Sequence, residues 1–294
     1  MPNGELTGGR VLVAYKGTMG LIVVSGATGR LGGRVARRLG GDLRLLVRDP
    51  ARAPEVPGAE IAVAEYADRR SVRAALRGAE TVLMVSAAET PDRVAQHRAF
   101  VDAAATAGVR HLVYTSFAGA APGATFTLAR DHWATEQHIR ASGLEWTFLR
   151  DNLYADFLPF MVGDDGVIRG PAADGRAAVV AQDDIADAAI AVLRDPSSHA
   201  GETYDLTGPE ALTLTEAAGI VTRATGREVR YHPETLEEAY ASRERYQAPR
   251  WQVDAWVSTY TAIAADELAT VTGDVARLTG HPATSLMDLL TRAH

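Results

Sequence analysis

The glycines after the first apolar run are the residues whose spacing most clearly indicates chemistry. Val23-Val24-Ser25 leads into Gly26-Ala27-Thr28-Gly29-Arg30-Leu31-Gly32, with a glycine at every third position. Such glycines permit a tight turn, a close approach of the backbone to a ligand, and tight packing of a helix on a strand. Free N–H groups at the start of that helix attract anions. The segment therefore predicts a pyrophosphate site of the kind that holds a nicotinamide dinucleotide.

Arginines close to this loop indicate which dinucleotide is bound. The second apolar run ends at Val47-Arg48-Asp49, where an acidic residue would bond the ribose of NAD and an arginine would accept the extra phosphate of NADP. Arg48 comes first, Arg30 and Arg52 are near, and guanidinium groups bind phosphate bidentately. The sequence therefore predicts NADP(H) as the preferred cofactor. Asp49 leaves NAD(H) open, and solvated surface charge is the alternative for the arginines.

Alternating strand-like and helical stretches in the first half of the chain predict the scaffold for this loop. The pattern is typical of a parallel sheet covered on both faces, and right-handed crossovers make it a Rossmann-type doubly wound α/β fold. A glycine loop at the first strand–helix junction of such a series disfavours the alternative of a turn that binds nothing. We expect strands at 21–25, 43–47, 61–64, 81–86, 111–115, 146–149 and 203–206, and helices at 30–39, 71–76, 92–107, 128–141 and 183–193.

A change of pattern divides the chain. Residues 152–182 are rich in glycine, proline and aromatics, and the chain after residue 209 is largely helical with one strand near 228–231. We therefore expect a Rossmann domain at 21–152 and 183–208, and a smaller, mainly helical substrate lobe at 153–182 and 209–294. Residues 1–20 lack the features of a signal peptide and are interpreted as an N-terminal extension, because Met19 immediately precedes the first strand.

Composition excludes several classes of function. The net charge of −7 is spread along 294 residues without a basic block, so nucleic-acid binding is not expected. The absence of cysteine excludes disulfides and thiolate chemistry and fits a cytoplasmic protein. No apolar run approaches the roughly 18 residues of a membrane span, and the histidines lack metal-ligand spacing. We expect a small-molecule partner, no metal, and leave a homodimer open.

Several segments resemble the atypical short-chain dehydrogenase/reductases of the NmrA-like group, in particular its NAD(P)H:quinone oxidoreductase branch. The glycine loop is similar to that group's cofactor fingerprint, and Arg48-Asp49-Pro50 to its NADP-selecting strand end. The resemblance extends over residues 21–290. The other similar segments are Pro91-Asp92-Arg93-Val94-Ala95-Gln96-His97-Arg98, Val113-Tyr114-Thr115-Ser116, Asp131-His132-Trp133-Ala134-Thr135-Glu136, Leu149-Arg150-Asp151-Asn152-Leu153-Tyr154 and Thr279-Gly280-His281-Pro282-Ala283-Thr284-Ser285-Leu286.

The resemblance implies which residues line the cofactor. It also reveals a departure, because the quinone reductases of the group tend to read Arg-Asn-Gly where this chain has Arg150-Asp151-Asn152. The substrate is therefore less defined than the cofactor. The implied cofactor residues are Gly26, Thr28, Gly29, Leu31, Arg48, Ser86 and the segment around Asn152. Gly32 is added from the glycine spacing, and Arg30 from the argument on arginines and phosphate.

Typical members of the wider superfamily use a Tyr-x-x-x-Lys pair, which this chain lacks. The equivalent helix offers His132 and Glu136, and the chain's single lysine, Lys16, lies in the extension. The usual alcohol–ketone mechanism is therefore not expected. Quinones, cationic dyes and iminium ions remain accessible, because hydride transfer to them requires no strong proton donor.

Six residues are candidates for contact with the substrate, each with a structural alternative. Ser116 and Tyr114, at the carboxyl end of a strand, either bond a substrate oxygen or satisfy neighbouring backbone groups. His132 either donates a proton or pairs with Glu136 one helical turn away. Tyr154, Phe157 and Phe160 form either a flat aromatic pocket wall or an ordinary core-facing helix.

Together these features predict an NAD(P)H-dependent oxidoreductase that transfers hydride directly to a quinone-like or cationic aromatic acceptor. Two alternatives remain open at this point. One is a non-catalytic NAD(P)-binding regulator or redox sensor, a role that some NmrA-like proteins have. The other is a tailoring reductase of ketones, enones or imines.

Overall fold

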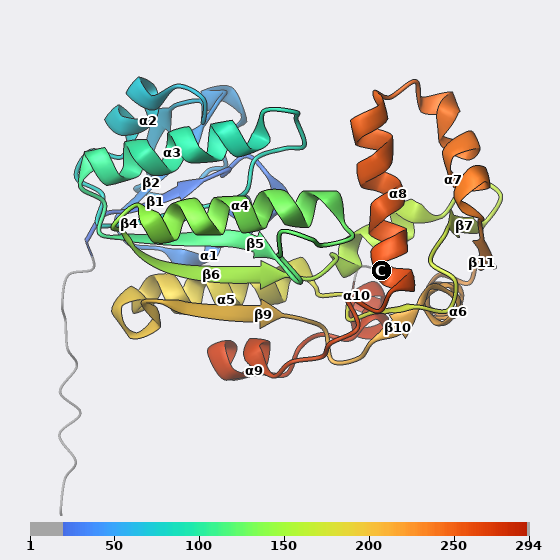
Figure 1. Ribbon diagram of the computed structural model, residues 1–294. Helices are drawn as coiled ribbons and strands as arrows, with labels where there is room; N and C mark the ends of the chain where they lie inside the picture. The colour runs from blue at the N-terminus through green and yellow to red at the C-terminus, as the bar shows by residue number, and fades with distance from the viewer. Residues whose placement is uncertain (1–19, 293–294) are drawn as a thin grey trace, which may run out of the picture.

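A parallel sheet of seven strands forms the centre of the computed structural model, which describes residues 20–292. The predicted N-terminal extension therefore lies outside the described residues, apart from Gly20. The strand order β3-β2-β1-β4-β5-β6-β9 confirms the Rossmann-type fold (Figure 1). The strands are β1 (Ile22–Ser25), β2 (Leu43–Val47), β3 (Glu60–Val63), β4 (Thr81–Met84), β5 (His111–Phe117), β6 (Glu145–Asp151) and β9 (Glu202–Leu206).

Helices cover both faces of this sheet, as the strands' continuous apolar character requires (Figure 1). Successive side chains of a strand point to opposite faces, so Val24 packs toward α1 and α5 whereas Val23 packs toward α2 and α3. Both valines are fully buried. The helices are α1 (Arg30–Leu39) and α5 (Gln182–Arg194) on one face, and α2 (Arg69–Ala75), α3 (Arg93–Ala107) and α4 (Thr127–Ala141) on the other.

A second lobe with its own apolar core lies beyond the carboxyl ends of the strands (Figure 1). Parallel pairing of β7 (Val167–Gly170) with β11 (Arg230–Pro233) joins its two pieces, and β8 (Arg176–Ala177) pairs antiparallel with β10 (Leu212–Thr213). Its helices are α6 (Leu214–Thr225), α7 (Leu236–Arg243), α8 (Arg250–Ala264) and α10 (Leu286–Arg292). The short 3-10 helices of the chain are η1 (Pro50–Arg52), η2 (Ala155–Met161), η3 (Pro196–His199) and η4 (Glu244–Tyr246).

Helix α9 (Asp274–Thr279) departs from the division predicted from the sequence. It packs against α5 and β9, and its Val275 belongs to the apolar cluster of the sheet. A polar contact reinforces this placement, since the Asp274 carboxylate accepts from the N–H of Asp205 at 2.9 Å. The chain thus returns from the second lobe to the Rossmann domain before its last helix.

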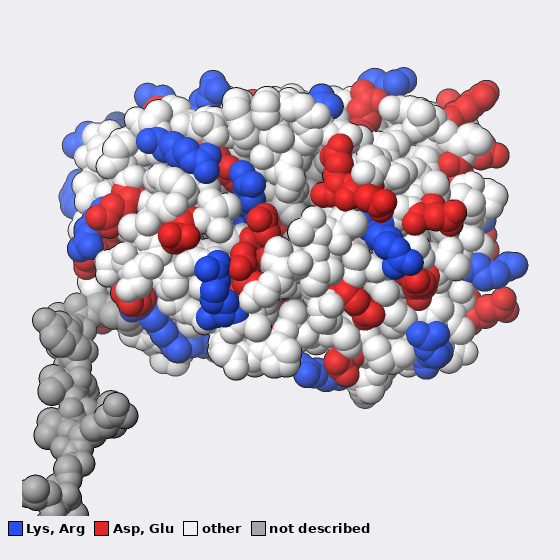
Figure 2. Space-filling model, turned by 60° about the horizontal axis from the view of Figure 1, so that its bottom comes forward, with Lys and Arg blue, Asp and Glu red and all other residues white. Residues whose placement is uncertain are grey.

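The surface carries charges of both signs. Figure 2, in which the lower side of Figure 1 is turned forward, shows basic and acidic side chains interspersed over that face. No helix within residues 20–292 is long and apolar enough to cross a bilayer.

Replacement of Gly32 by alanine should destabilise the fold. An added Cβ would lie 2.5 Å from the carbonyl oxygen of Gly26 and 2.9 Å from that of Ser25, which is too close for backbone atoms that cannot move independently. We expect a loss of about 1–3 kcal/mol in the free energy of unfolding, typical of overpacking, measured by urea denaturation.

Gly219→Ala is the matched control for this substitution. Gly219 also lies within a helix, α6, but its added Cβ would meet only the end of the Arg223 side chain at 3.5 Å. The control should be stabilised by up to about 1 kcal/mol through helix propensity. Equal effects of the two substitutions would contradict the packing argument.

Candidate dinucleotide and acceptor site

The start of α1 is open to an anion. Gly26 has φ 61°, in the left-handed region that favours glycine, and Gly29 is the N-cap residue but provides no side-chain cap. Among the described residues no backbone carbonyl accepts from the N–H groups of Arg30, Leu31 or Gly32. Three donors at the positive end of a helix thus face the turn, which is the arrangement that binds a pyrophosphate.

The carboxyl end of β2 presents the cation predicted to select NADP. Arg48 is exposed and, among residues 20–292, forms no ion pair. Asp49 has a structural task, because its carboxylate caps η1 by accepting from the N–H of Ala51 at 3.0 Å. An acid that is already hydrogen-bonded in this way is less available to a ribose. The geometry therefore favours Arg48 over Asp49 as the residue that contacts the cofactor.

The loop after β4 contains the predicted cofactor residue Ser86. Side chains from several other elements form hydrogen bonds to its backbone. Its backbone N–H and C=O groups are paired with residues of β1, β5 and α3 and with Tyr66, and these contacts fix the position of the loop. The pairs are Val85 N with Ser25 Oγ (3.0 Å), Ser86 N with Thr115 Oγ1 (2.8 Å), Ala87 N with His97 Nε2 (2.9 Å), Val85 O with Tyr66 Oη (2.7 Å) and Ala87 O with Arg93 Nε (2.9 Å).

His97 and Arg93 were not singled out as functional by the sequence reasoning, although both lie in a segment of family resemblance. They lie one helical turn apart at the start of α3, immediately after the β4 loop. This spacing is the sequence feature from which a joint role could have been predicted. His97 accepts from an amide, so its Nδ1 carries the proton and donates to Thr135 Oγ1 at 2.9 Å. Burial and the nearby Arg93 cation lower the pKa of His97 to about 3. The ring is therefore neutral.

His132 is also neutral, and its hydrogen bonds fix which nitrogen bears the proton. Arg93 Nη2 lies 3.0 Å from His132 Nε2, and a guanidinium only donates, so Nε2 must accept. Nδ1 then donates to the Tyr114 hydroxyl at 2.9 Å. Burial, followed by the charge of Arg93, holds the pKa of His132 well below its usual range. This geometry does not support His132 as a proton donor near neutral pH.

Glu136 has partners of its own, so the alternative of a His132–Glu136 pair is wrong. Its fully buried carboxylate accepts from Arg150 through both oxygens, at 2.8 and 2.7 Å. Ser116 Oγ donates to the same carboxylate at 2.7 Å. Ser116 therefore gives its proton to Glu136 rather than to a substrate oxygen or a backbone group. Tyr114 is fully buried, and burial raises the pKa of its phenol.

The segment after β6 uses its polar side chains internally. Asn152 donates through Nδ2 to the carbonyl of Leu268 at 3.0 Å and accepts through Oδ1 from Leu153 N at 2.7 Å, and its side chain is buried. Asp151 Oδ2 accepts from the Tyr154 hydroxyl at 3.0 Å, while its buried Oδ1 has no partner among the described residues. Burial raises the pKa of Asp151 well above its usual range and so favours the protonated form of this carboxyl.

The predicted aromatic residues lie beside the glycine loop. Tyr154 stacks on Phe157 with ring centroids 5.7 Å apart, and Phe157 and Phe160 are 44% and 71% exposed. The interpretation as a core-facing helix is therefore wrong for these two phenylalanines. Both rings lie against the Arg30 guanidinium, at 5.5 and 5.2 Å. Tyr154 is more enclosed, through its bond to Asp151.

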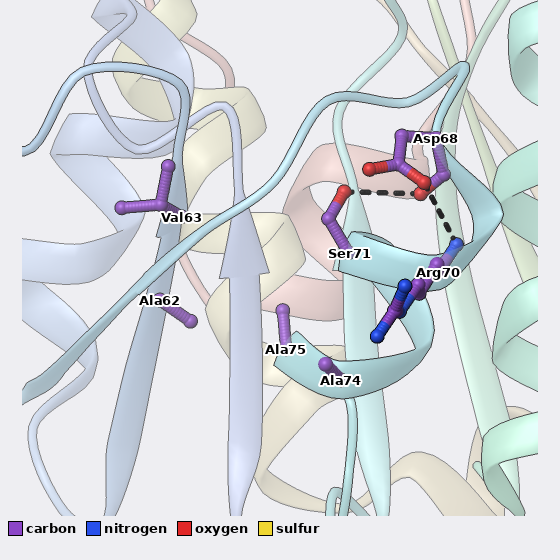
Figure 3. A pocket seen from close by; sticks show the side chains of 7 residues that line it. All are labelled: Ala62, Val63, Asp68, Arg70, Ser71, Ala74 and Ala75. Carbon is purple, nitrogen blue, oxygen red and sulfur yellow. Dashed lines mark hydrogen bonds between the residues drawn. The ribbon is translucent and has the colours of Figure 1, made fainter.

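A hollow of about 520 Å³ lies elsewhere, between the edge strand β3 and α2 (Figure 3). None of the predicted cofactor or substrate residues lines it. Its acidic residue, Asp68, is occupied in capping α2, with its carboxylate accepting from the N–H of Arg70 at 2.9 Å. Within the described residues, no group of three histidine, aspartate or glutamate side chains is arranged to hold a metal ion.

Comparison with known proteins shows which family the chain belongs to. The profile of the NmrA-like family matches residues 18–248. An NAD(P)H azoreductase from Xenophilus azovorans is 33% identical over 282 residues, covering 93% of this chain and 98% of that protein. The NADPH complex of an NADPH-dependent quinone oxidoreductase from Escherichia coli superposes with a TM-score of 0.83 at 30% identity, covering 92% of this chain and 99% of the other.

A third comparison extends the range of chemistry among these relatives. The triphenylmethane reductase of a Citrobacter species superposes with a TM-score of 0.82 at 30% identity, covering 92% of this chain and 98% of that one. The family profile spans the whole sheet and ends at residue 248, before α8, whereas the relatives and solved structures named above cover more than nine-tenths of the chain. The chain is a member of the NmrA-like family.

Proposed function

We propose that this protein is an NAD(P)H-dependent oxidoreductase that transfers hydride directly to a quinone-like or cationic aromatic acceptor. The observation that carries the proposal is the uncapped start of α1, where three backbone N–H groups and the turn at Gly26 form a pyrophosphate site. The relatives support it. The names of two of them include NAD(P)H or NADPH, and the three names point to azo compounds, quinones and triphenylmethane dyes as acceptors.

NADP(H) is the preferred cofactor in this proposal. A dinucleotide bound at α1 lies across the carboxyl ends of the strands, with its adenosine half toward β2. Arg48, at the end of β2, then meets the 2′-phosphate, and it has no competing carboxylate among the described residues. The nicotinamide half extends the other way, past the rigid β4 loop toward the ends of β5 and β6. The acceptor lies there, with Tyr154 as its proposed wall.

The acceptor class follows from what the site does not supply. Hydride delivery to a ketone leaves an alkoxide with a conjugate-acid pKa of ~16, near that of water, whereas delivery to a quinone leaves a phenolate with a pKa of ~10. The difference corresponds to roughly 8 kcal/mol of oxyanion stabilisation that a quinone does not require. A cationic dye requires none, because hydride neutralises it. The protein's part is then to hold the two reactants close and aligned.

The hydrogen bonds of the predicted catalytic residues agree with a protein that positions the two reactants and supplies no strong proton donor. Ser116 donates to Glu136, His132 donates to Tyr114, and Tyr114 is fully buried. No proton in this set is directed to a substrate oxygen. We propose that the three residues position the carboxyl end of β5 rather than protonate the acceptor.

A cytoplasmic location remains part of the proposal and rests on the absence of cysteine.

Turnover with a panel of acceptors tests this function. Purified protein, NADPH and either a quinone, a triphenylmethane dye or a simple ketone should give loss of nicotinamide absorbance with the first two, and little with the ketone. Cofactor binding without turnover on any acceptor would instead indicate a sensor. Turnover confined to ketones, enones or imines would indicate the tailoring reductase and contradict the proposal.

Replacement of Arg48 by aspartate should reverse the cofactor preference. The variant loses a charge-assisted contact with the 2′-phosphate and gains a repulsive carboxylate, so we expect NADPH affinity to fall at least about tenfold. NADH affinity, measured by the same fluorescence titration, serves as the internal control and should be unchanged or higher. An unchanged ratio of the two affinities would show that Arg48 does not contact the phosphate.

Replacement of His132 by asparagine separates a structural role from proton donation. Arg93 would lose its buried acceptor, which should lower stability by about 1–3 kcal/mol, whereas kcat with a quinone should change only a few-fold. Because the pKa of His132 lies well below its usual value, the ring stays neutral and kcat should show no His132 titration between about pH 6 and pH 8.

His138→Asn is the control on the same helix. His138 lies near the protein surface and bonds Asp102 at 2.7 Å, so its replacement should affect neither quantity strongly. A loss of 10²-fold or more in kcat for a well-folded His132→Asn variant, of the size expected for a general acid, would restore His132 as the proton donor.

A further inference from the structure

Three arginines follow one another along one side of α1: Arg30, Arg34 and Arg38. The second and third pair with carboxylates and, within the part of the chain that the structure describes, the first does not. Arg34 pairs with Asp183 at 2.8 Å and with Asp156 at 3.1 Å. Arg38 pairs with Asp183 as well, at 2.5 Å. Among residues 20–292, Arg30 makes no ion pair. The row therefore ends, at the open start of the helix, in a cation that the described carboxylates leave uncompensated.

Two aromatic rings hold that cation. The Arg30 guanidinium lies 5.5 Å from the ring centroid of Phe157 and 5.2 Å from that of Phe160, within the range of cation–π attraction. The exposure of these rings is unusual for phenylalanine, so burial does not explain their position. Planar guanidinium groups can stack on rings while their N–H groups bind an anion in the same plane.

The segment that carries these rings is firmly anchored. Asp156 lies in the sequence between Tyr154 and Phe157. Its carboxylate accepts from the N–H of Gln182 at 2.8 Å and from Arg34. Ala155 and Leu158 are buried. The 3-10 helix η2 is thus tied to α1 and α5, while Phe157 and Phe160 are left to contact Arg30.

Topology separates Arg30 from the 2′-phosphate side of the sheet. Arg48 follows β2, whereas η2 follows β6, and these strands lie on opposite sides of β1 in the sheet order. Contact with η2 therefore draws Arg30 toward the nicotinamide half of a bound cofactor. Side chains in the first turn of a helix lean toward its N-terminus, where the free N–H groups lie.

We propose that Arg30, oriented by Phe157 and Phe160, binds the pyrophosphate of the dinucleotide and does not read the 2′-phosphate. This inference rests on the proposed function and revises the grouping of Arg30 with Arg48 made from sequence proximity. It assigns the two arginines to different parts of the cofactor. Arg30 contributes to affinity for NADH and NADPH alike, and Arg48 contributes to the choice between them.

Dissociation constants for NADPH and NADH, measured by fluorescence titration, test the assignment. Arg30→Gln should weaken both coenzymes by the same factor, roughly tenfold or more for a lost charge-assisted contact. Arg48→Gln should weaken NADPH only. Arg37→Gln is the control, because Arg37 is another exposed arginine of α1 without an ion pair among the described residues, and it should change neither constant.

A double-mutant cycle tests the role of the rings. The Phe157→Leu/Phe160→Leu variant should weaken both coenzymes a few-fold when Arg30 is present and have no further effect in the Arg30→Gln background. Additive effects would mean that the rings contact the ligand independently and would overturn their orienting role. Thermal unfolding of each variant checks that the fold is retained.

Other results would overturn the assignment of Arg30. A loss of NADPH affinity alone in Arg30→Gln would make Arg30 a second reader of the 2′-phosphate, and no loss for either coenzyme would exclude it from the site. Failure of the wild-type protein to bind either coenzyme is a distinct outcome. It would refute the proposed function itself, before any variant is compared.

Discussion

The close contact of α1 with β1 is the constraint on which the rest of the structure depends. At Gly32 the helix approaches the carbonyl oxygens of Gly26 and Ser25 so closely that no side chain fits between them. This approach fixes the turn at Gly26 and leaves the first amides of the helix without intramolecular acceptors. A residue with a side-chain cap at Gly29 would satisfy one of these amides internally. The absence of a cap is therefore what makes the helix start available to an anion, at some cost in helix stability.

A second constraint concerns the chemistry at the proposed nicotinamide site. The positions occupied in many short-chain dehydrogenases by tyrosine and lysine hold His132 and Glu136, and here they belong to two separate buried networks. One joins His132 to Arg93, which pairs with Asp131 at 3.7 Å and supports the β4 loop. The other joins Glu136 to Ser116 and Arg150. Both networks are almost fully satisfied, which makes them rigid and poor sources of protons. A site of this kind suits acceptors whose reduced form is already stable, so the loss of the tyrosine–lysine pair and the choice of acceptor have one physical basis.

Much of the fold and of the candidate site could be predicted from the sequence. Contacts between residues that are distant in the chain could not. The glycine loop, the strand order class and helix 30–39 follow from local spacing and periodicity, and all agree with the structure. The pairing of β7 with β11 was not predicted, because parallel strands from separate segments leave no local turn signal. The partners of Ser116 and Asn152 were likewise beyond reach, since each lies on another element. Asp49 was ambiguous for a different reason. Its carboxylate can either cap η1, which is a local contact, or bind the ribose of a cofactor, and the sequence alone does not show which.

Charge distribution explains why the site is built from so few cations. A chain with a net charge of −7 repels a dinucleotide at long range unless positive potential is concentrated where the phosphates bind. Asp156 and Asp183 neutralise Arg34 and Arg38 and thereby fasten α1 to α5 and η2, so those arginines serve the fold. Arg30 and Arg48 are left without carboxylate partners among the described residues, one at each side of the helix start. Because ion pairs neutralise Arg34 and Arg38, the positive potential on this side of α1 is greatest near the uncapped amides. The same packing that holds α1 in place therefore also determines where an anion can bind.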